Sequence, residues 1–182
     1  RNTDLRQAVK ALVNERLAQR TLEQVQVSSG EIFLLATGAL ERSLPRLNNR
    51  MLILSPFDNS VIQRERLNSL FSFNYQLECY VPEAKRRYGY FCLPLLYRSE
   101  FIGRMDCKAH RQSRCLEIKS LHVELPGVDL DQFIPAFVSA IKTFCHWQQC
   151  DSVSLTTTQP NNIAQLIRRM ASHEGLLAGV AN

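Results

Sequence analysis

Apolar positions at the start of the chain follow a helical spacing and then an alternating one. The helical stripe comprises Leu5, Val9, Leu12, Val13 and Leu17. It predicts a helix over residues 3–19, with Thr3 as its cap. Two alternating runs, 22–27 and 31–37, flank a Ser-Ser-Gly turn and predict a β-hairpin. The chain therefore opens with a helix and a hairpin.

The pattern changes after the hairpin. Residues 38–50 are polar and irregular, which indicates a short helix or a linker to a second unit. The patterns then predict a strand at 51–54, a turn at 55–59, a helix at 61–70 and an extended aromatic segment at 71–75. Further strands are predicted at 76–81, 88–97, 101–108 and 115–124. Successive antiparallel strands with short turns suggest a small barrel or a strongly curled sheet.

The last third of the chain reads as helix, strand and helix. Residues 131–149 carry one apolar face, and Pro135 is tolerated near the first turn. A strand at 153–157 and a helix at 160–172 follow. We therefore expect an α+β chain. Residues 1–50 would form part of a winged helix (a helix plus the wing hairpin), and residues 51–182 a small antiparallel β-barrel with a C-terminal helix–strand–helix.

Composition limits the kind of protein. The 182 residues are 45% hydrophobic and 21% charged, which is enough apolar content to bury a core. No apolar run approaches the roughly 20 residues that a membrane helix needs, and no signal peptide is visible. We expect a cytoplasmic protein that does not act at a membrane. Because the first residue is Arg1 rather than Met, we also expect a fragment of a longer protein.

Six cysteines allow three disulfides, but most lie in apolar strand-like or helical runs. Buried free thiols of a cytosolic protein explain them better. Two groups could be considered as metal ligands: Cys107, His110 and Cys115, and Cys145, His146 and Cys150. Neither group repeats the paired C-x2-C spacing of a structural zinc site. We therefore expect no metal and no cofactor.

Positive charge is concentrated in one stretch. The chain carries 22 basic and 17 acidic residues, a net charge of +5. Residues 85–114 contain eight basic residues, opposed only by Glu100 and Asp106. Aromatic residues are interleaved with these charges, which predicts a strand pair with one side against a core and the other toward a polyanion. The alternative is an ordinary solvated sheet face.

Three linked motifs then point to a family. They are LSPFDN at 54–59, LFSFNYQLECYVPEAKRRYGYFCLPLL at 70–96 and IGRMDCKAHR at 102–111. Together they resemble the YcaQ-like winged-helix DNA glycosylases, which excise alkylated bases and unhook interstrand crosslinks. The resemblance implies the last winged-helix portion followed by the C-terminal β-barrel. The chain departs from the family pattern at Ile62-Gln63, where Trp-Asp is frequent, at Asn74 and at His110.

The resemblance also implies a catalytic triplet, Gln–apolar–Gln or Gln–apolar–Asp, that positions or activates the attacking water. The family carries it in its N-terminal region. This chain contains Gln24-Val25-Gln26 on the first strand of the hairpin, where an alternating strand can produce the triplet by chance. We expect the catalytic motif to lie upstream of Arg1, with Gln24 and Gln26 as the candidates within the chain.

Candidate DNA contacts follow from charge and resemblance together. Phosphate contacts are expected from Lys85, Arg86, Arg87, Arg104, Lys108 and Arg111. Tyr88 and Tyr90 could stack on a base or ribose, or pack in the core. Asp58 and Asn59 could shape a loop facing the DNA, or bond to their own turn. Arg64 is a further candidate on an exposed helix, and Arg98 lies at a hairpin tip that could enter a groove.

The leading hypothesis is the DNA-binding C-terminal part of a DNA-repair glycosylase that excises alkylated bases and unhooks crosslinks. Its partner would be alkylated or crosslinked double-stranded DNA, and the chain would be a monomer that is inactive by itself. One alternative is a non-catalytic winged-helix regulator, which would form a dimer on a specific site. Another is a barrel that binds a protein or small molecule and has no salt-sensitive affinity for DNA.

Overall fold

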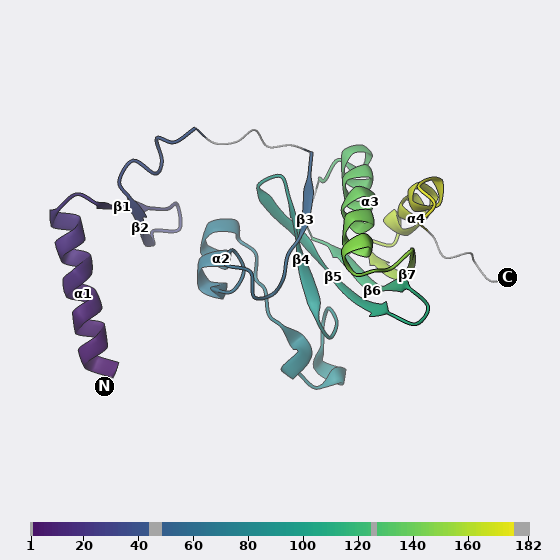
Figure 1. Cartoon of the computed structure of the whole chain (residues 1–182), viewed down its shortest axis with the longest axis horizontal. Helices are drawn as coiled ribbons and strands as arrows, with labels where there is room; N and C mark the ends of the chain where they lie inside the picture. The colour runs from purple at the N-terminus through teal and green to yellow at the C-terminus, as the bar shows by residue number, and fades with distance from the viewer. Residues whose placement is uncertain (1, 44–48, 125–126, 177–182) are drawn as a thin grey trace. The chain divides into compact units, whose positions relative to one another are not determined.

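The computed structural model describes residues 2–43, 49–124 and 127–176, which belong to two compact units, Arg1–Arg46 and Leu47–Asn182 (Figure 1). The first unit contains helix α1 (Asn2–Ala18) and the antiparallel hairpin β1 (Leu22–Gln26) and β2 (Ile32–Ala36). Gly30 has a φ of +88°, the left-handed conformation that the hairpin turn requires. The predicted helix and hairpin are confirmed, while the winged-helix assignment stays a prediction.

The second unit is built on a five-stranded sheet in the order β3-β4-β5-β6-β7. Its strands are β3 (Met51–Ile53), β4 (Cys92–Tyr97), β5 (Glu100–His110), β6 (Cys115–Val123) and β7 (Ser152–Gln159). Its helices are α2 (Arg64–Phe71), α3 (Leu130–Trp147) and α4 (Ile163–His173), with short 3₁₀ turns η1 (Glu78–Tyr80) and η2 (Glu83–Lys85). Strands β3 to β6 are antiparallel, and β7 is parallel to β6. The α+β class is therefore confirmed.

The predicted β-barrel is wrong. In the described part of the chain the sheet is open, with β3 at one edge and β7 at the other. The cause is α3, which crosses over after β6 and returns the chain as a parallel neighbour instead of an antiparallel closing strand. None of the helices in the described ranges combines the length and apolar character needed to cross a membrane.

Two predicted strands are also wrong in part. Residues 76–81 contain the turn η1 instead of a strand, and residues 88–91 precede β4 as a loop. Pro82 has no N–H to donate to a strand partner, and Gly89 has a φ of +148°. The N–H groups of this loop bond to carboxylates instead, as described below. Residues 44–48 of the predicted linker, including Pro45, lie outside the described residues.

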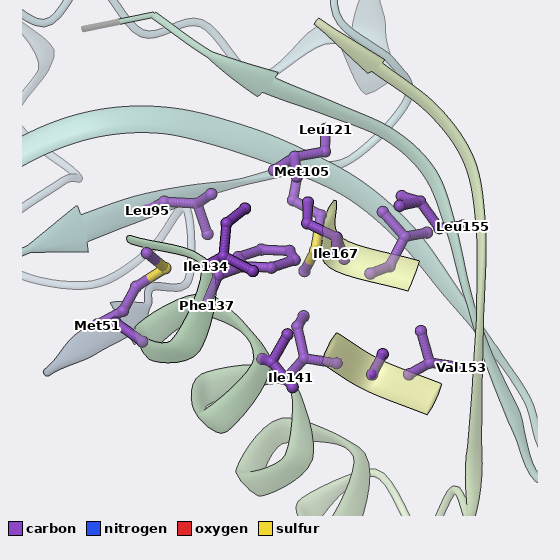
Figure 2. Packing of buried hydrophobic residues seen from close by; sticks show 14 of the residues in the cluster. Met51, Leu95, Met105, Leu121, Ile134, Phe137, Ile141, Val153, Leu155 and Ile167 are labelled. Carbon is purple, nitrogen blue, oxygen red and sulfur yellow. The ribbon is translucent and has the colours of Figure 1, made fainter. Parts of the chain in front are cut away.

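One face of the sheet packs against α3 and α4 and forms the main core (Figure 2). Phe133 and Phe137 of α3 stack with ring centroids 5.8 Å apart. Figure 2 shows residues from β4, β5 and β6 meeting α3 and α4 in this core, among them Leu95, Met105, Leu121 and Ile167. The apolar stripe that predicted the helix at 131–149 is thus the face that the sheet covers.

The opposite face of the sheet carries a smaller core and a polar cluster. Its apolar members are Val61, Leu67, Phe73, Tyr75, Cys92 and Phe101. The Tyr75 hydroxyl donates to the carbonyl of Cys92 at 2.6 Å. In β5, Met105 faces the main core, whereas Arg104 contacts Phe73 of the smaller core. The buried charge of Arg104 therefore lies on the face of the sheet that does not pack against α3.

Candidate nucleic-acid interface

The three consecutive basic residues lie on a loop, residues 85–90, which we call the basic loop. The buried carboxylate of Glu78 accepts hydrogen bonds from three successive N–H groups of this loop. The donors are Arg87 at 3.0 Å, Tyr88 at 2.7 Å and Gly89 at 3.1 Å. A carboxylate that receives several backbone N–H bonds fixes the backbone that donates them. These bonds to its main chain therefore hold the loop in one conformation.

A second buried carboxylate, that of Asp106 on β5, holds the end of the same loop. It accepts from the N–H of Tyr90 at 2.8 Å and of Phe91 at 3.3 Å. A Cβ added at Gly89 would lie 2.4 Å from Asp106 Oδ2, so glycine allows the close approach. The Ser120 hydroxyl of β6 donates to the carbonyl of Tyr88 at 2.7 Å. The sheet thus anchors the basic loop at several points.

Glu78 makes this anchoring sensitive to pH. Burial by itself would raise the pKa of Glu78. The hydrogen bonds from the loop N–H groups and the charge of Arg104 outweigh burial, so the pKa lies below its ordinary value of 4.5. A pKa depressed by folding contributes stability that is fully present above about 4.5 and is lost as pH falls through the folded value. We expect Glu78→Gln to remove this contribution. Urea unfolding should show a difference in the free energy of unfolding between wild type and variant that becomes smaller below pH 4.5. A difference that does not change with pH would contradict the lowered pKa of Glu78.

Arg104, predicted to contact phosphate, is 1% exposed and already fully engaged. Its Nε and Nη2 donate to the carboxylate of Glu124 at 2.5 and 3.0 Å, and Nη2 also donates to the carbonyl of Asn74 at 2.9 Å. The guanidinium lies 3.9 Å from the ring centroid of Tyr88 and 4.6 Å from that of Phe73. DNA cannot reach it in this conformation. We therefore leave Arg104 out of the proposed contacts and assign it a structural role.

The other side chains of the basic loop reach solvent. Lys85 and Arg87 are exposed, and the Arg87 guanidinium lies 5.0 Å from the ring centroid of Tyr88. Arg86 is half-buried: its Nε donates to the carbonyl of Val81 at 2.9 Å, and its guanidinium lies 4.9 Å from the Tyr90 ring centroid. Tyr90 is 53% exposed, whereas Tyr88 is half-buried against Arg104. Of the two tyrosines, Tyr90 is the one with ring surface open to a ligand.

The remaining basic candidates divide between the two ends of the β4–β5 hairpin. Lys108 and Arg111 are exposed and follow Asp106, so they lie toward the end that holds the basic loop. Arg98 is exposed at the opposite end, in the β4–β5 turn, where it donates to the Asn49 side chain at 2.8 Å and to the Gln132 side chain. Six residues of β4 separate the two ends, roughly 20 Å of strand. The structure therefore groups Lys108 and Arg111 with the loop and sets Arg98 apart.

Residues of the SPFDN turn bond to residues close by in the sequence. The Asp58 carboxylate accepts from the N–H of Ser60 at 2.8 Å. The Asn59 carbonyl accepts from Arg66. Arg64 donates to the carbonyl of Pro56 at 3.0 Å, and its guanidinium lies 4.5 Å from the ring centroid of Tyr75. Of the two sequence interpretations of Asp58, this geometry favours the local one, in which its side chain bonds to the backbone of its own turn.

Gln24 and Gln26 are exposed on β1 in the first unit. They pair with Leu34 and Ile32 of β2. The Gln26 amide donates to the carbonyl of Gly30 at 3.2 Å within the same hairpin. Both side chains are exposed, so the geometry of the hairpin adds nothing to their candidacy as catalytic residues.

The six cysteines are free thiols. Burial raises the pKa of the Cys92, Cys107 and Cys145 thiols to about 12, so these side chains stay protonated and unreactive at neutral pH. Across the described ranges, no cluster of three or more His, Cys, Asp and Glu side chains is arranged to hold a metal ion.

Sequence reasoning missed Glu78, His122 and Gln159. Glu78 lies in the run LECYV, within the strand predicted at 76–81. A lone carboxylate in such a run, shortly before a glycine-containing loop, is the signal that could have identified it. His122 contacts Tyr88 with ring centroids 5.1 Å apart and lies opposite Gln159 across β6 and β7. Only the parallel pairing brings these two together, and no local pattern shows it.

An open sheet with two helices on one face and a fixed basic loop on the other defines an α+β domain suited to bind a polyanion. Over residues 2–147 the chain matches the protein family described as DNA glycosylase AlkZ-like. The chain therefore belongs to the AlkZ-like DNA glycosylase family, which confirms the resemblance seen in the sequence. No solved structure matches the chain. Membership implies base excision in DNA repair as the class of activity and DNA as the partner.

Proposed function

We propose that this chain is the DNA-binding C-terminal part of a glycosylase that excises alkylated bases and unhooks interstrand crosslinks. The observation that carries the proposal is the basic loop. Lys85 and Arg87 are exposed and Arg86 is half-buried on a loop whose backbone is bound by two buried carboxylates, Glu78 and Asp106. A preordered loop loses little conformational entropy when it meets a phosphate backbone. The family assignment supports DNA as the source of those phosphates.

We further propose that the exposed cations Lys85 and Arg87, with Arg86, Lys108 and Arg111, contact phosphates, while Tyr90 offers a ring to a base or ribose. Residues 1–50 would act as the last part of a winged helix. A catalytic role for Gln24 and Gln26 of β1 is supported only by their spacing in the sequence. In this division of roles, the chain binds DNA. Catalysis is carried out by residues of the parent protein other than Gln24 and Gln26.

Two assays on the purified chain test this division of roles. Fluorescence anisotropy with a labelled blunt duplex at low salt should show weak binding. Incubation with alkylated duplex DNA, followed by chromatography, should show no released base. Base release by the chain would overturn the assignment of catalysis to other residues and would make Gln24→Ala and Gln26→Ala the next variants. Absence of duplex binding would overturn the proposed function itself.

A further inference from the structure

A polar hollow opens where β6 and β7 end. It has a volume of about 530 Å³, and its polar walls include His122, Thr157, Gln159 and Asn161. This volume lies within the range of small-molecule binding sites. Residues 157–161 lie beyond the range that matches the family, so nothing in that match assigns the hollow a role.

The hollow is next to the basic loop. His122 forms one of its walls and makes an edge-to-face contact with Tyr88, with ring centroids 5.1 Å apart. Tyr88 in turn lies beneath the exposed guanidinium of Arg87, at 5.0 Å. Ser120, two residues before His122, donates to the Tyr88 carbonyl and so fixes this part of the loop to β6. Arg87, Tyr88 and His122 therefore form a chain of contacts that leads from the basic loop to the hollow.

The walls of the hollow offer uncharged donors and acceptors. Gln159 lies directly opposite His122 in the β6–β7 register and hydrogen-bonds to its ring. Burial lowers the pKa of His122, and the nearby cations Arg104 and Arg87 lower it further. The hydrogen bond to Gln159 and the charge of Glu124 oppose this, but the net direction is down. A neutral imidazole has one donor and one acceptor nitrogen, and each side-chain amide adds both kinds of group.

This combination suits a nucleotide better than a simple anion. Uncharged groups that both donate and accept can pair with the edge of a nucleobase, whereas a phosphate accepts only. The cation that a phosphate needs is supplied by Arg87, outside the hollow. An unpaired base has its pairing edge free, but a base inside a duplex does not.

We propose that the hollow binds the base of an unpaired DNA nucleotide whose phosphate lies at Arg87. Gln159 and Asn161 contact the base edge, and His122 forms the wall nearest the basic loop. The inference rests on the proposed function in that the basic loop holds the adjoining duplex. With this nucleotide site, the chain would bind a junction between duplex and single-stranded DNA more tightly than a blunt duplex.

The test compares two labelled DNAs by anisotropy: a blunt duplex, and the same duplex with a single-stranded overhang. The whole chain should bind the overhang substrate about three- to tenfold more tightly, the worth of one or two hydrogen bonds. The double variant Gln159→Ala/Asn161→Ala should lose this preference and bind the blunt duplex as before. Both residues are exposed, so the variant should fold, and Thr156→Ala, also exposed on β7, is the matched control.

The outcomes separate the two proposals. Blunt-duplex binding without an overhang preference, or a preference that survives the double variant, would overturn the nucleotide site and leave the basic loop as the DNA contact. An equal loss on both substrates would also overturn it, because the hollow would then contribute no preference for unpaired bases. Absence of binding to either DNA would overturn the proposed function first.

Discussion

Replacement of Arg104 by alanine is expected to lower the free energy of unfolding by about 3–5 kcal/mol. The guanidinium is 1% exposed and donates to Glu124 and to the Asn74 carbonyl. Its removal would strand the partly buried carboxylate of Glu124 and leave the faces of Tyr88 and Phe73 without their cation. Removal of one partner of a buried ion pair lowers the free energy of unfolding by much more than the intact pair contributes to it, because the remaining charge is left buried and unpaired.

Urea unfolding followed by fluorescence would measure this loss. Lys108→Ala is the matched control, since Lys108 is exposed on the same strand and should change stability by less than about 0.5 kcal/mol. A double-mutant cycle with Glu124→Ala should give a coupling energy of roughly 0.5–3 kcal/mol. An Arg104→Ala protein within about 0.5 kcal/mol of wild type would show that Arg104 is a surface cation after all.

Glu78→Gln is expected to weaken duplex DNA binding about tenfold, although it removes a negative charge. The carboxylate receives three loop N–H groups, and a glutamine amide would turn a donor toward some of them. The loop backbone would lose about 2–4 kcal/mol of hydrogen bonding and its fixed conformation. Ordering the loop would then cost free energy at the moment of binding.

Glu83→Gln is the control that separates the effect of the loop conformation from the effect of losing one negative charge. Glu83 is exposed two residues before Lys85 and undergoes the same change of charge. We expect it to bind the duplex as tightly as wild type or more tightly, since only electrostatics change. Anisotropy titrations of the two variants at the same salt concentration make the comparison. Tighter binding by Glu78→Gln would mean that net charge, and not the ordered loop, governs affinity.

The sequence predicted the elements whose patterns are local. The apolar face of α3 and the alternation in β5 and β6 are set by contacts with one core, so their periods appear in the chain itself. The hairpin of β1 and β2 was predictable because its turn is three small residues. These elements agree with the structure to within a few residues.

Closure of the sheet could not be predicted in the same way. Whether β7 returns antiparallel or parallel depends on the crossover of α3, and both choices use the same alternation in β7. Residues 88–90 of the basic loop were predicted as the start of a strand at 88–97, in which Tyr88 and Tyr90 alternate. Its true conformation depends on Glu78 and Asp106, which lie 10 and 16 residues from the loop N–H groups that they bind.

The role of the candidate residues in DNA binding stays a prediction, but the structure shows where they lie. The excess charge at 85–87 does lie on an exposed loop. Arg104 was misplaced because an arginine on a strand gives no local sign of whether its face meets solvent or a cluster of aromatic rings. The pairing of His122 with Gln159 depends on strands separated by a helix, so sequence spacing could not show it.

The salt dependence of duplex binding tests the central claim most directly. The logarithm of affinity should fall with the logarithm of salt concentration by about 0.9 for each phosphate contact. Lys85/Arg86/Arg87→Ala should flatten this slope by about 2–3. The control Lys142→Ala/Arg169→Ala removes two exposed cations from α3 and α4, on the other side of the sheet, and should leave the slope unchanged. A slope that is the same in wild type and the triple variant would contradict the assignment of phosphate contacts to the basic loop.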